Sequence, residues 1–278
     1  MKRYITVFVN TVLYGSFAVG AALSVHASID LLGGSGDFSI SSGSSSGGGL
    51  ASPNYTSGVT VSGWSNPNNG YTFVWTQSSI NSATKVNGPA GALSLYNSNN
   101  GGAQNILTAG SAAGDLPASY TGNIIGADGG YQVGALESSP FSVVANQQYK
   151  VSFYYAAAQQ SGFPNQQTSA QFTVGLGTSG NLYSSGTTTT PLVYEPGNSS
   201  SAWSSYSATF TAAASSSSEV LSFLSYGTPS GVPPFSLLAD VTLDSVPEPS
   251  TVFAGCLMLL PLGFTVVRYF RKANAKAA

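Results

Sequence analysis

Five segments in the second half of the sequence alternate between apolar and polar residues, at 149–158, 170–177, 206–212, 220–227 and 237–246. In the first of them, Tyr149, Val151 and Phe153 fall on one face, and Lys150 and Ser152 on the other. A period of two is that of a β-strand with one buried face. Because polar turns with Gly or Pro separate the segments, we predict an all-β protein, folded as an antiparallel β-sandwich or jelly roll.

Two shorter segments, 57–64 and 71–75, have the same pattern and are also predicted strands. In the last of the five longer segments the alternation predicts a single face for Leu237, Ala239, Val241 and Leu243. Two stretches rich in Ser, Thr and Gly, at 39–58 and 184–201, show no apolar period and are predicted to be loops.

The first 27 residues have the features of a secretory signal. Lys2 and Arg3 precede an apolar run at 4–22, and Val25 and Ala27 are small residues at the positions that a signal peptidase reads. We predict cleavage before Ser28, with an uncleaved membrane anchor as the alternative. In either case the body of the protein is exported.

The other end of the chain carries a second apolar segment, at 251–267, without a charged residue. As a helix it would be about 25 Å long, which is the short end of what a bilayer core requires. Four of the eight Lys and Arg residues follow it, namely Arg268, Arg271, Lys272 and Lys276. This asymmetry predicts a transmembrane helix with a cytoplasmic basic tail at 268–278; the alternative is a buried terminal helix of a globular domain.

A short proline-rich motif stands directly before this span and consists of Val246, Pro247, Glu248, Pro249 and Ser250. Its prolines fix φ and remove backbone donors, so the motif is held extended as a protease cleft requires. Motif, span and basic tail, at 246–278, resemble the PEP-CTERM sorting signal of bacterial exported proteins, although the tail is longer and richer in Ala than usual. The resemblance implies a secretion translocon, processing by an exosortase, and delivery to the cell surface or beyond.

Between the two ends, residues 28–245 form the predicted sandwich domain. This body has two lysines, Lys85 and Lys150, against nine acidic residues, and no arginine. A phosphate backbone requires a basic surface, so nucleic-acid binding is excluded. The lone cysteine, Cys256, lies in the predicted span, so the body has no disulfide.

The inventory of reactive side chains argues against an enzyme. The single histidine, His26, belongs to the predicted signal, so the body lacks the base of a Ser–His–Asp triad and the usual ligands of catalytic zinc. A Ser–Lys dyad would have to use Lys85 or Lys150. Glycoside hydrolysis by two carboxyl groups remains open, but no spacing selects a pair.

Aromatic residues near Asn- and Gly-rich loops are candidates for glycan binding, because rings stack on the apolar faces of sugars. These candidate contacts are Trp64, Tyr71, Trp75 and Tyr131. The alternative is that the rings belong to the core, since Tyr71, Phe73 and Trp75 share one face of a predicted strand.

The body also resembles the galactose-binding-like jelly rolls carried by many PEP-CTERM proteins. The segments that carry this likeness are "DLLGGSGDFS", "NIIGADGGYQVGALE", "NQQYKVSFYYAAAQ", "AWSSYSATFTA" and "LLADVTLDSVPEPS". The resemblance implies a structural calcium ion between the first and last strands, with Asp37 and Asp240 as candidate ligands. Plain surface aspartates are the alternative, and no other cofactor is predicted.

Taken together, the sequence predicts an exported protein, sorted by an exosortase, with a structural or adhesive role at the cell surface or in the extracellular matrix. A carbohydrate-binding module for exopolysaccharide is the first alternative, and a glycoside hydrolase is the second.

Overall fold

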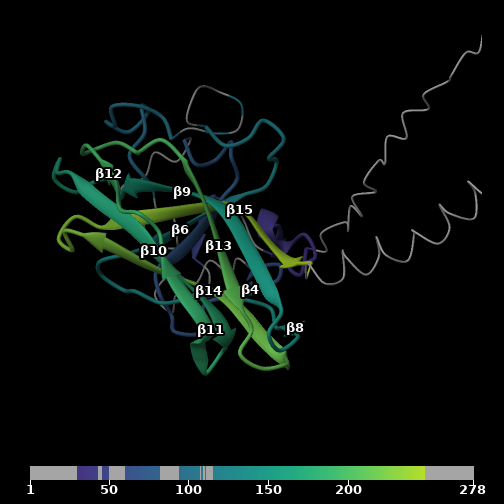
Figure 1. The fold of residues 1–278 in the computed structure, drawn as a ribbon. Helices are drawn as coiled ribbons and strands as arrows, with labels where there is room; N and C mark the ends of the chain where they lie inside the picture. Colours follow the sequence, from purple (N-terminus) through teal and green to yellow (C-terminus); the bar gives the residue numbers. More distant parts are fainter. Residues whose placement is uncertain are drawn as a thin grey trace, which may run out of the picture. The chain divides into compact units, whose positions relative to one another are not determined.

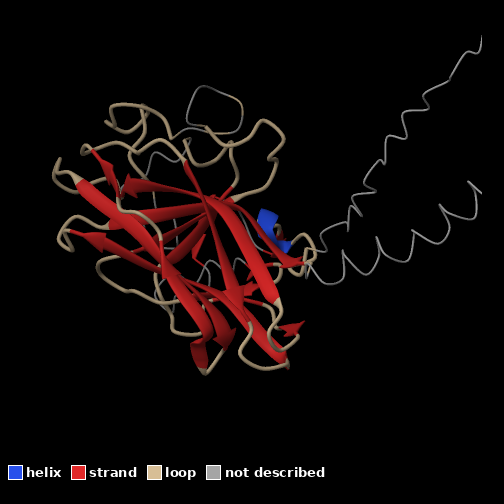
Figure 2. Ribbon diagram, viewed as in Figure 1, coloured by secondary structure: helices blue, strands red, loops and turns tan. Residues whose placement is uncertain are grey.

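Two antiparallel β-sheets make up most of the computed structural model, which describes residues 30–42, 46–49, 60–81, 94–106, 108, 110 and 115–247 (Figure 2). The elements are η1 (Ser35–Asp37), β1 (Ile40–Ser42), β2 (Ser46–Gly49), β3 (Thr60–Val61), β4 (Trp64–Ser65), β5 (Thr72–Trp75), β6 (Ile124–Asp128), β7 (Leu136–Ser138), β8 (Phe141–Val143), β9 (Gln148–Gln159), β10 (Thr168–Thr178), β11 (Asn181–Thr189), β12 (Val193–Glu195), β13 (Ser204–Thr211), β14 (Ser216–Thr228) and β15 (Pro234–Val246). The predicted all-β, antiparallel architecture is confirmed.

The two large sheets are built around different long strands (Figure 1). The six-stranded sheet has the order β13-β9-β15-β6-β5-β2. The seven-stranded sheet has the order β11-β10-β14-β7-β4, with β12 also paired to β10 and β8 to β14. Strands β1 and β3 form a small separate sheet.

The main core lies between the two large sheets. Val151 and Phe153 of β9 meet Phe172 of β10 and Phe223 of β14 there. The ring centroids of Phe153 and Phe223 lie 5.0 Å apart and those of Phe172 and Phe223 5.7 Å apart, with nearly perpendicular planes, an arrangement that aromatic pairs prefer. The alternation in the sequence therefore predicted correctly that Tyr149, Val151 and Phe153 of β9 share the inward face.

A second hydrophobic cluster covers part of the outer face of the six-stranded sheet. Phe73, Trp75 and Leu237 project from the sheet into it. Residues from the long connections, including Leu95 and Leu116, close over them. One end of this face is therefore buried under loops, and the other end is left to the solvent.

The predicted loop at 184–201 was wrong, because the structure forms most of β11 and all of β12 within it. Both strands pair with β10. Their alternation was invisible because threonine and serine occupy many positions in β11, including its inward-facing Thr188, which bonds to Tyr206. Threonine is nevertheless a good strand former, since its branched side chain fits a pleated surface.

The predicted single face of β15 was also wrong, because a β-bulge interrupts the strand. Ala239 pairs with Tyr154 and Thr242 pairs with Ser152, so two residues of β15 stand opposite one residue of β9. The extra residue reverses the alternation. Leu237 and Ala239 consequently belong to the outer cluster, whereas Val241 and Leu243 belong to the inter-sheet core.

The first described residue of the chain lies beside the last strand. Asp30 forms an antiparallel bridge with Asp244, and the Leu31 backbone N–H donates to the Leu243 carbonyl at 2.8 Å. The chain therefore enters the sandwich next to the point at which β15 leaves it.

Several sequence predictions lie outside the described residues. These are the signal at 1–27, the motif residues Glu248, Pro249 and Ser250, the apolar span at 251–267 and the basic tail at 268–278. The described part of the chain contains no helix with the length and apolar character needed to cross a membrane.

Candidate functional site

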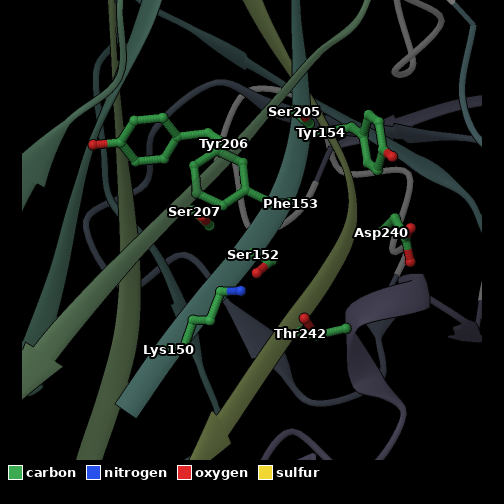
Figure 3. A pocket seen from close by; sticks show the side chains of 9 residues that line it. All are labelled: Lys150, Ser152, Phe153, Tyr154, Ser205, Tyr206, Ser207, Asp240 and Thr242. Atoms are coloured by element: carbon green, nitrogen blue, oxygen red, sulfur yellow. The ribbon is translucent and has the colours of Figure 1, made fainter. Parts of the chain in front are cut away.

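A groove opens on the solvent-exposed end of the outer face of the six-stranded sheet, over strands β9, β13 and β15 (Figure 3). Its volume is about 310 Å³. The residues that border it are Lys150, Ser152, Phe153, Tyr154, Ser205, Tyr206, Ser207, Asp240 and Thr242. We refer to it as the hydroxyl groove, because four of these residues are Ser or Thr.

Strand pairing places the polar side chains of the groove in rows across the sheet. Ser152 of β9 stands between Ser207 of β13 and Thr242 of β15. Paired residues on neighbouring strands project to the same face at about 5 Å spacing, so these three hydroxyls form a continuous polar floor.

The next rows form the two ends of the groove. Tyr154 pairs with Ser205 on one side, and its ring packs partly against the outer hydrophobic cluster. In the other direction, Lys150 pairs with Asp244 of β15. The groove thus runs from a half-buried tyrosine ring to an exposed ammonium group, and in Figure 3 the Lys150 ammonium points toward Ser152.

Asp240 lies at one lip of the groove because it is part of the bulge in β15. Its φ of 52° is in the left-handed region, which a bulge residue commonly adopts and for which Asp is better suited than a branched residue. Burial raises the pKa of the Asp240 carboxyl. The bulge therefore supplies the groove with one partly desolvated carboxyl group.

Helix η1 packs against this bulge. A Cβ atom built on Gly36 would lie only 1.6 Å from the Val241 carbonyl oxygen, so only glycine permits the approach. The Trp64 indole N–H donates to the Ser35 carbonyl at 2.7 Å and secures η1 from the core side.

Two of the predicted glycan contacts are core residues, which corrects the sequence interpretation. Trp64 packs against Phe38 and Phe223 in the inter-sheet core, with ring centroids 5.2 and 6.0 Å away. Trp75 is 0% exposed and lies in the outer cluster. Neither ring is accessible to a polysaccharide. Both belong to the apolar faces of their strands, and these faces are covered by other parts of the protein.

The other two predicted contacts, Tyr71 and Tyr131, lie together at the rim of the sandwich. Their ring centroids are 5.6 Å apart, and Tyr131 is 74% exposed. Asp128 holds the Tyr131 loop, accepting hydrogen bonds from the N–H groups of Gly130 and Tyr131 at 2.8 and 3.1 Å. This pair lies just before β5 and in the turn after β6, and it is not part of the groove lining.

Burial raises the pKa of the Tyr120 hydroxyl, and the charges of the two predicted calcium ligands, Asp240 and Asp37, raise it further. Asp37 already accepts hydrogen bonds from the backbone N–H and the hydroxyl of Ser39 at 3.0–3.1 Å. Among the described residues, no group of three or more acidic, His or Cys side chains could hold a metal ion. A cation here would thus need backbone oxygens in addition to the two carboxylates.

Most residues of the hydroxyl groove were not singled out from the sequence. Lys150 and Ser152 were assigned to a solvent-facing strand surface, which is correct. The convergence of β9, β13 and β15 was not visible, because it depends on pairing between segments that are about 50 to 90 residues apart.

Neither a family model nor a curated protein matches this chain. Distant similarity to solved structures exists. An arabinose-bound α-L-arabinofuranosidase is 15% identical with a TM-score of 0.33, and the match covers 45% of this chain but only 20% of that enzyme.

Two smaller proteins are covered more fully. The K2 cleaved adhesin domain of Lys-gingipain is 14% identical with a TM-score of 0.32, over 74% of this chain and 100% of that domain. The carbohydrate-binding module TmCBM61, solved in complex with β-1,4-galactotriose, is 11% identical with a TM-score of 0.30, over 66% of this chain and 90% of the module. At these scores the similarity is too weak to transfer a ligand or an activity to this chain.

Proposed function

We propose that this protein is an exported surface or matrix protein whose sandwich binds a neutral polysaccharide in the hydroxyl groove. The observation that carries the proposal is the row formed by Ser207, Ser152 and Thr242 beside the Tyr154 ring. Hydroxyl side chains both donate and accept hydrogen bonds, which matches the hydroxyls of a sugar. An aromatic ring offers an apolar face at the same place.

The charges of the groove favour a neutral ligand over an anionic one. Lys150 is the only Lys or Arg among the described residues, and it stands beside Asp244 with Asp240 nearby. A polyanion would meet more negative than positive charge there. We propose that this binding serves the structural or adhesive role predicted from the sequence.

A binding role without catalysis is favoured because the groove lining contains a single carboxyl group, that of Asp240. Glycoside hydrolysis uses two carboxyl groups separated by about 5–10 Å. Four other acids, Asp128, Glu137, Glu195 and Glu219, are buried. We therefore propose that the protein is not an enzyme.

The test is to measure binding of the full-length protein, in mild detergent, to neutral polysaccharides such as galactan, xylan and β-glucan, with alginate as an anionic comparison. We expect saturable binding to at least one neutral polymer and a roughly tenfold or greater loss on Tyr154→Ala, since aromatic anchors dominate such sites. Tyr131→Ala is the matched control. Unchanged binding by Tyr154→Ala together with loss in Tyr131→Ala would place the site at the rim and overturn the groove assignment. Released reducing ends, lost in Asp240→Asn, would overturn the non-enzymatic role.

Export and sorting need a separate test, because the residues concerned lie outside the described part of the chain. We propose that Glu248 is read by the sorting protease, so Glu248→Ala should leave the C-terminal segment uncleaved. Cell fractionation with mass spectrometry of the mature termini measures this directly. Finding the intact chain, both apolar ends included, as a soluble cytosolic protein would overturn the export proposal.

A further inference from the structure

A second aromatic surface lies on the outer face of the seven-stranded sheet, across the core from the hydroxyl groove. Its most exposed members are Tyr194 of β12 and Tyr226 of β14, which are 57% and 52% exposed. Both strands flank β10. We refer to Tyr183, Tyr194 and Tyr226, with the polar residues between them, as the tyrosine face.

The strand register shows that the two exposed rings project from the same side of the sheet. Tyr194 pairs with Ser169 of β10, and Tyr226 pairs with Gln171. Ala170 and Phe172, which alternate with Ser169 and Gln171 along β10, point toward the other sheet and are buried. Ser169, Gln171 and their partners therefore project from the outer face of the sheet, where the Ser169 side chain is itself buried.

The spacing of these tyrosines suits an extended ligand. Two strand spacings of about 4.8 Å and an offset of two residues separate their Cα atoms by roughly 12 Å. The surface between them is polar but uncharged, with Thr228 exposed and Gln171 half-buried. The buried Ser169 hydroxyl lies 2.9 Å from that of Thr228 and supports it from below. Two exposed rings, together with the Thr228 hydroxyl and the Gln171 amide, offer stacking and hydrogen bonds along a line.

The third ring is fixed by the hairpin between β10 and β11. A Cβ atom on Gly175 would lie 2.4 Å from Cδ1 of Tyr183, so this ring occupies the space above a glycine of β10. A Cβ on Gly177 would lie 2.2 Å from the Asn181 carbonyl oxygen. The start of β11 therefore lies over the outer face of β10, where the Ser179 hydroxyl donates to the carboxylate of Glu137 at 2.7 Å.

This cover explains the boundary of the tyrosine face. Glu137 and Ser222 are buried beneath the hairpin although they point outward, whereas Tyr194 and Tyr226 remain open. The hairpin thus removes a carboxylate from the surface and leaves an uncharged aromatic strip beside it.

We propose that the tyrosine face is a second polysaccharide-binding site, so that one molecule holds two glycan chains on opposite faces of the sandwich and cross-links them. This inference rests on the proposed function of the hydroxyl groove. A polysaccharide fits better than a protein partner because the described residues of this face present no exposed charge and few aliphatic side chains, whereas protein hot spots are fully desolvated anchors. Two sites on one molecule also raise retention on a polymer by avidity.

The test is bridging between two populations of beads that carry the same neutral polysaccharide, with full-length protein added in detergent. The variants are Tyr154→Ala for the groove, Tyr194→Ala with Tyr226→Ala for the tyrosine face, and Tyr131→Ala as a matched control. We expect the wild type and the control to bridge the beads. Each site variant should still bind one bead population but lose bridging, and retention on the polymer should fall by about a hundredfold.

Three outcomes separate this inference from the groove proposal and from trivial causes. Normal bridging by the tyrosine-face variant would overturn the second site and leave the groove proposal intact. Unchanged binding and bridging by Tyr154→Ala would instead remove the groove. The inference would also be overturned if sedimentation showed the wild type to be a dimer and the tyrosine-face variant to be a monomer, because the face would then be a contact between protein chains. Melting temperatures that match the wild type exclude misfolding of the variants.

Discussion

Gly36 and Val241 are in direct backbone contact, and this contact joins η1 to the bulge at the edge of the hydroxyl groove. A Cβ atom at position 36 would lie only 1.6 Å from the Val241 carbonyl oxygen. The bulge also carries Asp240 at a positive φ. The shape of the groove lip thus depends on a residue from the opposite end of the sandwich sequence.

Replacing Gly36 with alanine should therefore destabilise the protein and displace the bulge. We expect a loss of about 1–3 kcal/mol in the free energy of unfolding, as for other overpacked sites, measured by urea denaturation. Gly180→Ala is the matched control, because a Cβ atom there would have no heavy atom within 4 Å and the residue's φ lies outside the left-handed region. Equal stability of the two variants would contradict the contact.

Glu195 should be essential for the loop that follows β12. Its carboxylate accepts hydrogen bonds from the N–H groups of Thr168, Gly197 and Ser199 at 2.7–3.2 Å, and the residue is fully buried. Glu195→Ala leaves these buried donors unpaired and should cost about 3 kcal/mol or more by urea denaturation. Glu195→Gln keeps an acceptor oxygen and should cost less; the reverse order would exclude hydrogen bonding as the cause.

Stability should rise on mild acidification. Burial raises the pKa values of Asp128, Glu195 and Asp240 above their ordinary values in the unfolded chain. At pH values between the unfolded-state and the folded-state pKa values, the folded protein binds more protons than the unfolded chain. The contribution of these groups to the free energy of unfolding therefore falls as pH rises through that window. The urea midpoint should accordingly be higher near about pH 5 than near about pH 7.5. Glu195→Gln should reduce the difference, and a midpoint that increases with pH would contradict the prediction.

Calcium should have little effect on the thermal stability. Among the described residues, the carboxylates whose charges act on the Tyr120 hydroxyl are those of Asp240 and Asp37, and Asp37 is already engaged by Ser39. The melting temperature should be the same with excess chelator as with millimolar calcium. A calcium-dependent increase that Asp240→Asn abolishes would instead establish the ion implied by the resemblance to galactose-binding-like domains.

The alternation of apolar residues was sufficient to predict the five long strands β9, β10, β13, β14 and β15, but it missed β6 and β7 and did not give every face correctly. In β15 both sides of the bulge are apolar, so the sequence shows no sign that Leu237 and Leu243 face opposite ways. The positive φ of Asp240 that accompanies the reversal is a tertiary feature, stabilised by η1. Strand β11 was missed for a different reason, since its many threonines and serines give no apolar period.

The location of the candidate site was not predictable from the sequence. Aromatic residues near Asn- and Gly-rich loops predicted sugar binding, which stays a prediction. The individual contacts were harder to predict, because Trp64 and Trp75 lie in strands whose burial depends on what packs over them. The groove depends on which strands become neighbours, and that information resides in long-range pairing.

The interior position of β15 in its sheet has a mechanical consequence. Strand β15 lies in the interior of the six-stranded sheet, bonded to β9 on one side and β6 on the other, and it also contributes Asp240 and Thr242 to the groove. If the C-terminal segment anchors the protein and the groove holds a glycan, as proposed, tension between the two would load these ladders in shear along the strand. Many hydrogen bonds then resist together, so a sandwich attached in this way would withstand pulling better than one held by an edge strand.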